Sequence, residues 1–277
     1  MSTPNFMPTA SDGDKRLFSN VARLEIKISD TRITRVLGGT AFYVTDGTPN
    51  FWLFTNRHCL DMQYGDLQGK GFGIIELNVF FPAAQEHLSP CSFVCDFKSA
   101  VFKYCEVADL ACFSFEILKS EAKQSAVKTF NMNLVVEENF YNSVRAGSQV
   151  LFLGYPGKLW DQTNQLPILR TATISSIPSV NYASSGQGPE PRVLVNGMSL
   201  GGSSGSPVFI QTKEGLKVLG MMGGHYPNID LKGSWESDVS AEVVSGTVGG
   251  SHSGLSYFIK SHLMHGYKTW PEKQFNT

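Results

Sequence analysis

The sequence has little charge and no excess of either sign. Charged residues make up 17% of the 277 residues, with 23 Lys and Arg against 24 Asp and Glu. Proteins that bind nucleic acid or anionic membranes usually carry a basic surplus, so we predict neither as a partner. No apolar run is long enough to cross a bilayer, and residues 1–20 lack the basic start and apolar stretch of a secretory signal. We therefore expect a cytoplasmic protein.

Cysteine is scarce, and its spacing is wrong for a metal site. The five cysteines include no C-x-x-C pair, so the sequence predicts no zinc or other metal, and nothing in it implies a cofactor. Their odd number and their places in apolar segments favour reduced, buried thiols that act as small apolar side chains. A disulfide between neighbouring cysteines is the alternative.

Long helical patterns are also scarce. Hydrophobic residues at 42% and aromatic residues at 12% suffice for a core, and they occur in short β-branched and aromatic runs separated by Gly, Pro, Asn and Asp. That rhythm is typical of strands and predicts an all-β protein. Two segments differ: 118–134, and 253–267, where apolar residues recur at a nearly helical period. The second predicts a C-terminal helix.

The predicted strands fall into two sets, which indicates two small β-barrels in tandem. We expect residues 1–19 to form an N-terminal extension and residues 20–125 to form the first barrel. A more polar connector would follow at 126–147, and residues 148–277 would hold the second barrel and the C-terminal helix.

The sharpest local pattern is a small-residue turn, Gly201-Gly202-Ser203-Ser204-Gly205-Ser206-Pro207, that precedes an apolar strand. Such a turn can expose the Ser204 hydroxyl and direct the backbone N–H groups of Gly202 and Ser204 at one point. An oxyanion formed during acyl transfer would be stabilised there, and one such donor changes the rate by about 10²–10³.

A serine nucleophile needs a positioned base and a group that orients the base. His58 directly follows an apolar strand in Phe54-Thr55-Asn56-Arg57-His58-Cys59, and Asp109 stands at the entrance to another in Ala108-Asp109-Leu110-Ala111-Cys112. A carboxylate beside so apolar a segment needs hydrogen bonds. We predict a catalytic triad of His58, Asp109 and Ser204.

These three motifs resemble those of the chymotrypsin-like serine peptidases, and they occur in the same order, His, Asp, Ser. The resemblance implies two six-stranded antiparallel Greek-key β-barrels, with His58 and Asp109 on the first and Ser204 on the second. It also implies hydrolysis of a polypeptide substrate through an acyl-enzyme. The turn Gly154-Tyr155-Pro156-Gly157 makes bacterial glutamyl endopeptidases and HtrA-like domains the more similar members.

The resemblance also suggests which residues bind substrate. The strand after residue 220 would hold an extended peptide by β-strand addition. The expected binding residues are Met198, Ser199, Met222, Gly223, Gly224 and His225. Met198 stands where trypsin has its pocket aspartate, which argues against cleavage after Lys or Arg. Met222 stands where glutamyl endopeptidases have a histidine, so we expect an apolar or small residue on the cleaved side.

Trypsin is activated when a new N-terminus pairs with an aspartate directly before the nucleophile, and here that residue is Ser203. The resemblance therefore implies that no N-terminal cleavage is needed, and it leaves room for control by a regulatory protein partner. Two alternatives stay open. One is a catalytically silent module that binds peptides on a trypsin-like fold, and the other is a protease effector of a larger bacterial stress or defence assembly.

Overall fold

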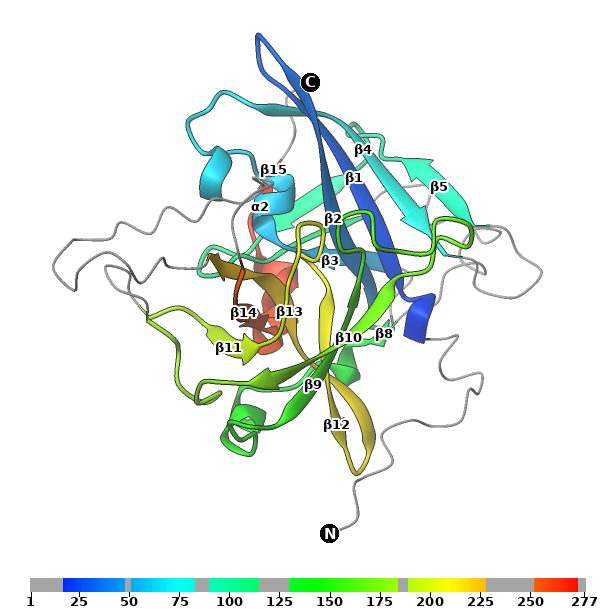
Figure 1. Cartoon of the computed structure of the whole chain (residues 1–277). Helices are drawn as coiled ribbons and strands as arrows, with labels where there is room; N and C mark the ends of the chain where they lie inside the picture. Colours follow the sequence, from blue (N-terminus) through cyan, green and yellow to red (C-terminus); the bar gives the residue numbers. More distant parts are fainter. Residues whose placement is uncertain are drawn as a thin grey trace, which may run out of the picture.

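The computed structural model of the chain describes residues 17–47, 51–82, 90–114, 130–183, 189–227 and 252–273. Figure 1 shows these residues folded into two β-sheets that pack against each other. The first sheet consists of β1 (Val21–Ser29), β2 (Thr34–Thr45), β3 (Phe51–Thr55), β4 (Gly73–Phe81), β5 (Cys91–Val94), β6 (Val101–Tyr104), β7 (Ala111–Ser114), β8 (Phe130–Asn131) and β15 (Glu272–Lys273). The second consists of β9 (Gln149–Gly154), β10 (Ile168–Ile174), β11 (Arg192–Asn196), β12 (Pro207–Thr212), β13 (Gly215–Pro227) and β14 (His252–Lys260).

The prediction of a mostly β, antiparallel fold is confirmed, but the prediction of two closed six-stranded barrels is not confirmed as a whole. The second sheet is a closed ring in the order β10-β11-β14-β13-β12-β9. In the part of the chain that the structure describes, the first sheet instead follows the path β15-β6-β7-β3-β2-β1-β4-β5, with β8 pairing in parallel to β2. Nine strands share it because the chain returns after the second sheet to add β15 beside β6.

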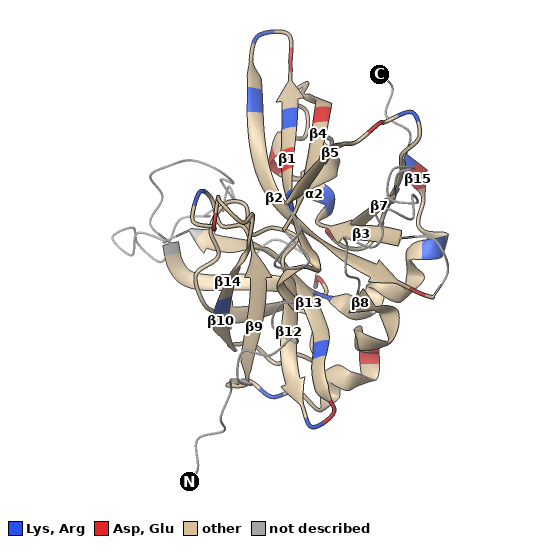
Figure 2. Ribbon diagram, turned by 90° about the vertical axis from the view of Figure 1, so that its right-hand side faces the viewer, with Lys and Arg blue, Asp and Glu red and all other residues tan. Residues whose placement is uncertain are grey.

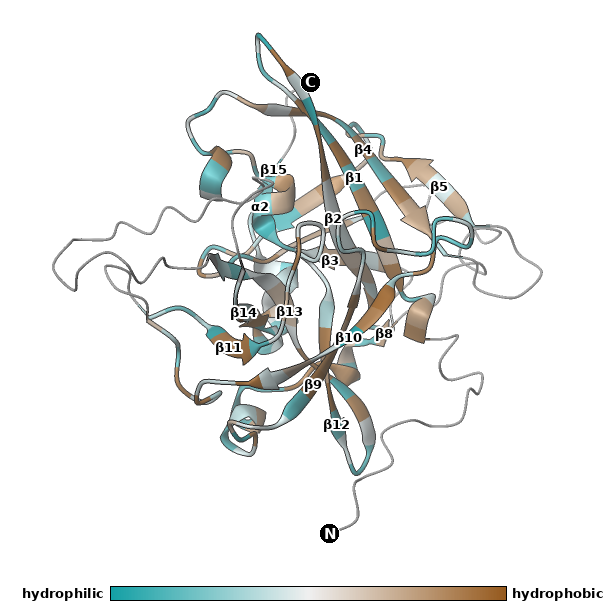
Figure 3. Ribbon diagram, viewed as in Figure 1, coloured by the Kyte–Doolittle hydropathy of each residue, from teal (hydrophilic) through white to brown (hydrophobic). Residues whose placement is uncertain are grey.

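Alternation of buried and exposed side chains explains β1, which has polar residues between its buried ones. Leu24, Ile26 and Ile28 are almost fully buried, while the residues between them are half-exposed. Side chains two apart share one face of a strand, so this period places the apolar face of β1 on the core. The brown and teal residues along β1 in Figure 3 show the same mixture.

The helices within the described ranges are short. They are α2 (Arg57–Leu60) and the 3-10 helices η1 (Gly65–Leu67), η3 (Met132–Leu134), η4 (Glu138–Asn142) and η5 (Ser261–Thr269). The predicted C-terminal helix is therefore corrected: 252–260 is strand β14, and only η5 is helical. The predicted helical pattern at 118–134 lies mostly outside the described residues, as does most of the predicted N-terminal extension 1–19.

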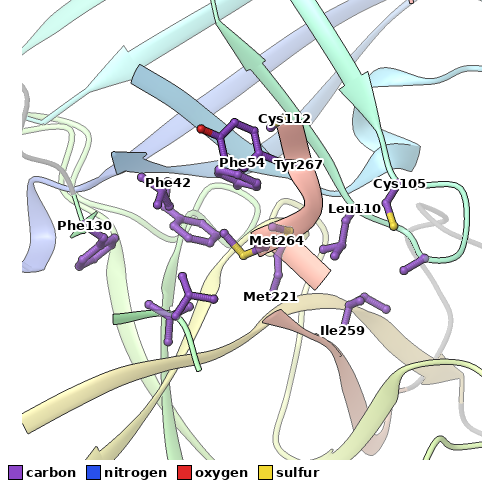
Figure 4. Packing of buried hydrophobic residues seen from close by; sticks show 14 of the residues in the cluster. Phe42, Phe54, Cys105, Leu110, Cys112, Phe130, Met221, Ile259, Met264 and Tyr267 are labelled. Atoms are coloured by element: carbon purple, nitrogen blue, oxygen red, sulfur yellow. The ribbon is translucent and has the colours of Figure 1, made fainter. Parts of the chain in front are cut away.

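A hydrophobic core fills the space between the two sheets. Phe42 and Phe54 from the first sheet meet Met221 from the second, and Met264 and Tyr267 of η5 close the cluster. Figure 4 shows these side chains directed toward one another. The Phe54 and Tyr267 rings meet edge-on with their centroids 5.6 Å apart. The core thus joins the two sheets and η5 into one unit.

Charge is spread over the surface. In Figure 2, Lys and Arg are interspersed with Asp and Glu over the ribbon. None of the helices in the described ranges has the length and apolar character needed to span a membrane.

We predict that Met264→Ala lowers the free energy of unfolding by about 2–5 kcal/mol, because it leaves a cavity between the sheets. Met264 is 0% exposed. Leu159→Ala is the control: Leu159 is 64% exposed, and its loss should change stability by no more than about 0.5 kcal/mol. Urea unfolding measures both, and equal effects would show that this core does not join the sheets.

Candidate active site

Strand pairing brings His58 and Asp109 to the same place. β3 pairs antiparallel with β7, with Thr55 opposite Ala111. Because antiparallel strands run in opposite directions, the residues that follow β3 lie beside those that precede β7. His58 follows β3 by three residues and Asp109 precedes β7 by two. Each motif flanks an apolar strand as predicted, and the pairing places both side chains at the same end of β3 and β7.

The Asp109 carboxylate uses both oxygens on His58. Oδ2 lies 2.7 Å from Nδ1 of the imidazole, and Oδ1 accepts the backbone N–H of His58 at 2.9 Å. Asp109 is 5% exposed, so these bonds offset much of the cost of burying its charge. They also fix the orientation of the ring. Nε2 is left as the ring nitrogen that can accept a proton from another group.

Neighbouring residues hold this pair in place. Asn56 is fully buried and donates Nδ2–H to the backbone carbonyl of Asp109 at 2.8 Å. Asp61 accepts from Arg57 Nε at 3.0 Å, one turn away in the short helix α2, and from Lys273 Nζ at 2.7 Å. The helix that carries His58 is therefore anchored at Asp109 and at Asp61.

Electrostatics favour the protonated imidazole. Burial lowers the pKa of His58, but the negative carboxylate of Asp109, with a smaller contribution from Cys59, outweighs it. The pKa of His58 is raised well above its ordinary value of 6.5. An imidazole in this setting can accept a proton and hold it as a stabilised cation.

The turn that carries Ser204 depends on two glycines. Gly202 and Gly205 both have φ of +87°, in the left-handed region that other residues avoid. A methyl group at Gly205 would lie 1.8 Å from the carbonyl oxygen of Thr40, and one at Gly202 would lie 2.4 Å from that of Tyr155. Only glycine lets this turn pack so closely against the backbone of both neighbours.

Gly39 and Thr40 of β2 lie between the serine turn and the segment that carries His58. The backbone N–H of Thr40 donates to the carbonyl of Ser204 at 2.8 Å. A methyl group at Gly39 would lie 3.5 Å from Sγ of Cys59, next to His58. The structure thus brings His58 and Asp109 into contact and places Ser204 on the other side of Gly39 and Thr40. Within the described ranges, the Ser204 hydroxyl makes no hydrogen bond to either of them.

The two predicted oxyanion donors are among the N–H groups that the turn leaves unused. Ser203 N–H donates to Leu200, Gly205 N–H to Met222 and Ser206 N–H to Ser203, at 2.9–3.0 Å. The N–H groups of Gly202 and Ser204 find no acceptor among the residues that the structure describes. An unpaired backbone donor is rare in a folded protein unless a ligand or water uses it. The turn can therefore donate two hydrogen bonds to an incoming oxyanion.

The predicted substrate strand lies beside this turn. β12 pairs with β13 only as far as Met221, and Gly205 N–H then donates to the carbonyl of Met222 at 3.0 Å. On the other edge, Gly224 pairs with Tyr257 of β14. Beyond Met222, the described part of the chain supplies no strand on the β12 side of Gly223 and Gly224. That edge can accept one further strand.

The predicted pocket residues have different surroundings. Met198 is 56% exposed, whereas Ser199 is 2% exposed and its backbone N–H donates to Ser256 Oγ at 3.0 Å. Met222 is 1% exposed and packs in the core of the second sheet, so its side chain is not accessible to a substrate in this conformation. His225 is half-buried, and burial lowers its pKa.

Three residues of the site escaped the sequence analysis. Asn56 holds Asp109, Thr40 holds Ser204, and Arg170 donates from β10 to Ser203 Oγ at 2.7 Å. Asn56 stands in the His58 motif, so its position in the sequence could have identified it as a residue of the site. Nothing in the sequence indicates that Thr40 or Arg170 contacts the serine turn, because both contacts depend on how the sheets pack.

The described residues contain no group of three or more His, Cys, Asp and Glu side chains that could hold a metal ion. None of the five cysteines, all of which lie in described residues, forms a disulfide.

The fold, the His58–Asp109 pair and the serine turn together define the class of antiparallel β proteins to which the trypsin-like peptidases belong. The family model described as the trypsin-like peptidase domain matches residues 39–221, more than half of the chain. The chain belongs to this family, and the predicted family is confirmed. No match was found among curated proteins.

The chain is also similar to solved structures. A thermostable serine protease, AL20, from an extremophilic microorganism is 14% identical, with a TM-score of 0.52 over 91% of this chain and 96% of that one. The apo MamO protease domain from Magnetospirillum magneticum is 13% identical, with a TM-score of 0.49 over 90% of this chain and 95% of that one. Deg5 is 14% identical, with a TM-score of 0.47 over 78% and 87%. The likeness to AL20 is one of fold.

We predict that Asp109→Asn lowers the pKa of His58 below 6.5. The substitution removes the charge that stabilises the imidazolium, and the remaining effect of burial favours the neutral ring. Titration of the histidine ring protons by NMR measures this. The pKa of His225 is the internal control, because burial alone lowers it and it should not move. An unchanged His58 pKa would show that Asp109 does not govern the charge of this imidazole.

Proposed function

We propose that the chain is a serine endopeptidase that hydrolyses peptide bonds through an acyl-enzyme. The observation that carries this proposal is the contact between His58 Nδ1 and Asp109 Oδ2 at 2.7 Å, on a member of the trypsin-like peptidase family. A buried carboxylate that fixes the orientation of an imidazole is the arrangement that turns a nearby hydroxyl into a nucleophile.

In the proposed reaction, the Ser204 hydroxyl attacks the scissile carbonyl and His58 Nε2 takes its proton. His58 then returns the proton to the leaving amine, and an acyl-enzyme on Ser204 remains. Water then attacks the ester while His58 takes its proton, and His58 returns that proton to Ser204 Oγ as the ester C–O bond breaks, which releases the second product and restores the enzyme. Asp109 holds the imidazole in the tautomer that has its acceptor at Nε2 and stabilises the imidazolium in both steps.

The N–H groups of Gly202 and Ser204 would stabilise the oxyanion in each tetrahedral intermediate. Their support is that neither finds an acceptor among the described residues, whereas the N–H groups of Ser203, Gly205 and Ser206 are all bonded. Donors fixed in place before the reaction need no reorganisation when charge develops, which is why they contribute strongly to rate.

The substrate would bind as an extended strand along Gly223 and Gly224, on the edge that β12 leaves uncovered. This binding mode uses the peptide backbone and therefore suits polypeptides of many sequences. The exposed side chain of Met198 supports a preference for apolar residues near the cleaved bond. No step of this reaction calls on a cofactor.

Serine-directed labelling tests the proposal. We predict that a fluorophosphonate labels the protein at Ser204, and that Ser204→Ala abolishes labelling because it removes the nucleophile. Ser179→Ala is the matched control: Ser179 is exposed, so its removal should leave labelling intact. Intact mass and peptide mapping give the readout. A folded protein that binds unfolded peptides but takes no label would instead be the catalytically silent peptide-binding module.

The labelling rate should rise with pH through a pKa above 6.5. His58 must be neutral to accept the proton of Ser204, and its pKa is raised well above 6.5, so protonated His58 suppresses the reaction at lower pH. The second-order rate of labelling, measured across pH, gives this pKa. A rate that has already reached its plateau below pH 6.5 would show that the pKa of His58 is not raised in the free protein.

A further inference from the structure

Arg170 lies beneath the serine turn and is not part of the proposed triad. It stands on β10 opposite Phe152 of β9, and its guanidinium carbon lies 4.4 Å from the centroid of the Phe152 ring. An arginine over an aromatic face gains a cation–π interaction and a flat packing surface. The closed second sheet therefore holds the guanidinium in one place.

The guanidinium connects two points of the segment that leads to the nucleophile. Nη1 donates to the carbonyl oxygen of Met198 at 3.0 Å, and Nη2 donates to Oγ of Ser203 at 2.7 Å. Ser203 is 0% exposed and directly precedes Ser204. Its Oγ also accepts the backbone N–H of Leu200 at 3.2 Å. One charged group thus spans the segment from end to end.

Arg170 makes these bonds without a compensating acid. No described carboxylate lies within ion-pair distance of it, and Nε is buried without a hydrogen-bond partner. Burial lowers the pKa of Arg170 to about 10, which still leaves the group charged at neutral pH. Keeping a cation there on neutral oxygens alone is costly. Arg170 stands where it donates two hydrogen bonds to the segment before Ser204.

We propose that Arg170 is a positioning residue that holds the Met198–Ser203 segment so that Gly202 N–H and Ser204 are presented for catalysis. The hydrogen bond between Arg170 and Ser203 ties the residue next to the nucleophile to β10. The turn is then held by a group already present in the chain, which is consistent with the expectation that no N-terminal cleavage is required.

The inference has a structural half, that Arg170 holds the turn in place, and a catalytic half, that this raises the rate of the reaction. Only the catalytic half rests on the proposed function. Ser203 N–H donates to the Leu200 carbonyl at 2.9 Å, so Leu200 and Ser203 bond each other twice and form a compact loop. Arg170 attaches that loop to β10. Without the attachment, the loop can rotate and move Gly202 N–H away from the oxyanion position.

Amide hydrogen exchange tests the structural half. We expect Arg170→Met to speed exchange in residues 198–206 by about tenfold or more, because the local opening of this segment becomes easier. Lys260→Met is the matched control. Lys260 is 3% exposed, donates to Asn181 Oδ1 at 2.9 Å and lies 5.2 Å from the centroid of the Tyr141 ring. It is thus a second cation over an aromatic ring, more deeply buried than Arg170 and without a contact to the turn.

Labelling kinetics test the catalytic half. Saturation kinetics with a fluorophosphonate separate the maximal rate from the half-saturating concentration. We expect Arg170→Met to lower the maximal rate about 10- to 100-fold, less than or equal to the loss of one oxyanion donor, with little change in half-saturation. Arg170→Lys should recover part of the rate by restoring one donor. The double variant Arg170→Met/Ser203→Ala should be little slower than Arg170→Met, because both substitutions break the same contact.

Each outcome decides one part. Unchanged exchange in 198–206 for Arg170→Met, or equal effects of Lys260→Met, overturns the positioning proposal. If Arg170→Met does not fold, Arg170→Lys and Ser203→Ala carry the same comparison. Faster exchange in a protein whose unaltered chain takes no label would leave the structural role standing and refute the proposed peptidase. Faster exchange with an unchanged maximal rate would restrict Arg170 to stability and overturn its catalytic role.

Discussion

The hydrogen bonds of one buried threonine join the two sheets at the site, and the rest of the arrangement depends on them. Thr40 N–H donates to the Ser204 carbonyl and Thr40 Oγ1 to the Gly202 carbonyl, each at 2.8 Å. The Thr40 carbonyl accepts from Thr55 Oγ1 at 2.7 Å. Thr55 lies three residues before His58, so Thr40 sets the distance between the proposed base and the proposed nucleophile. A shift of about 1 Å in such a distance is enough to cost a large factor in rate.

Two charged groups beside the site, buried Asp109 and partly buried Arg170, are held in opposite ways. The Asp109 carboxylate is neutralised in part by the imidazole beside it and is satisfied by hydrogen bonds at both oxygens. The Arg170 guanidinium has neutral partners only and leaves one nitrogen unsatisfied. A charge that is largely removed from water is usually paired, so the position of the partly buried, unpaired Arg170 is better explained by its contacts to the serine turn than by the stability of the core.

The sequence predicted the strands and the site motifs better than it predicted the closure of the sheets or the contacts between them. His58 and Asp109 were predictable as a pair because each flanks an apolar strand, and β3 and β7 are neighbours. The prediction of a C-terminal helix was wrong over 252–260 because β14 is buried on both faces. Phe258 packs in one hydrophobic cluster and Tyr257 in another. A strand buried in this way shows no alternation and can imitate a helical period. Arg170 looked like an ordinary strand residue, since its role depends on a turn 33 positions later.

The pairing of β15 with β6 has a consequence for how the molecule is made. Glu272 and Lys273 complete a sheet whose other strands all precede residue 132. Lys273 donates to Asp61, the residue directly after the helix that carries the proposed base. During translation, β15 of the first sheet is therefore synthesised only after all strands of the second sheet. The support for His58 is therefore completed only after the strands of both sheets have been synthesised.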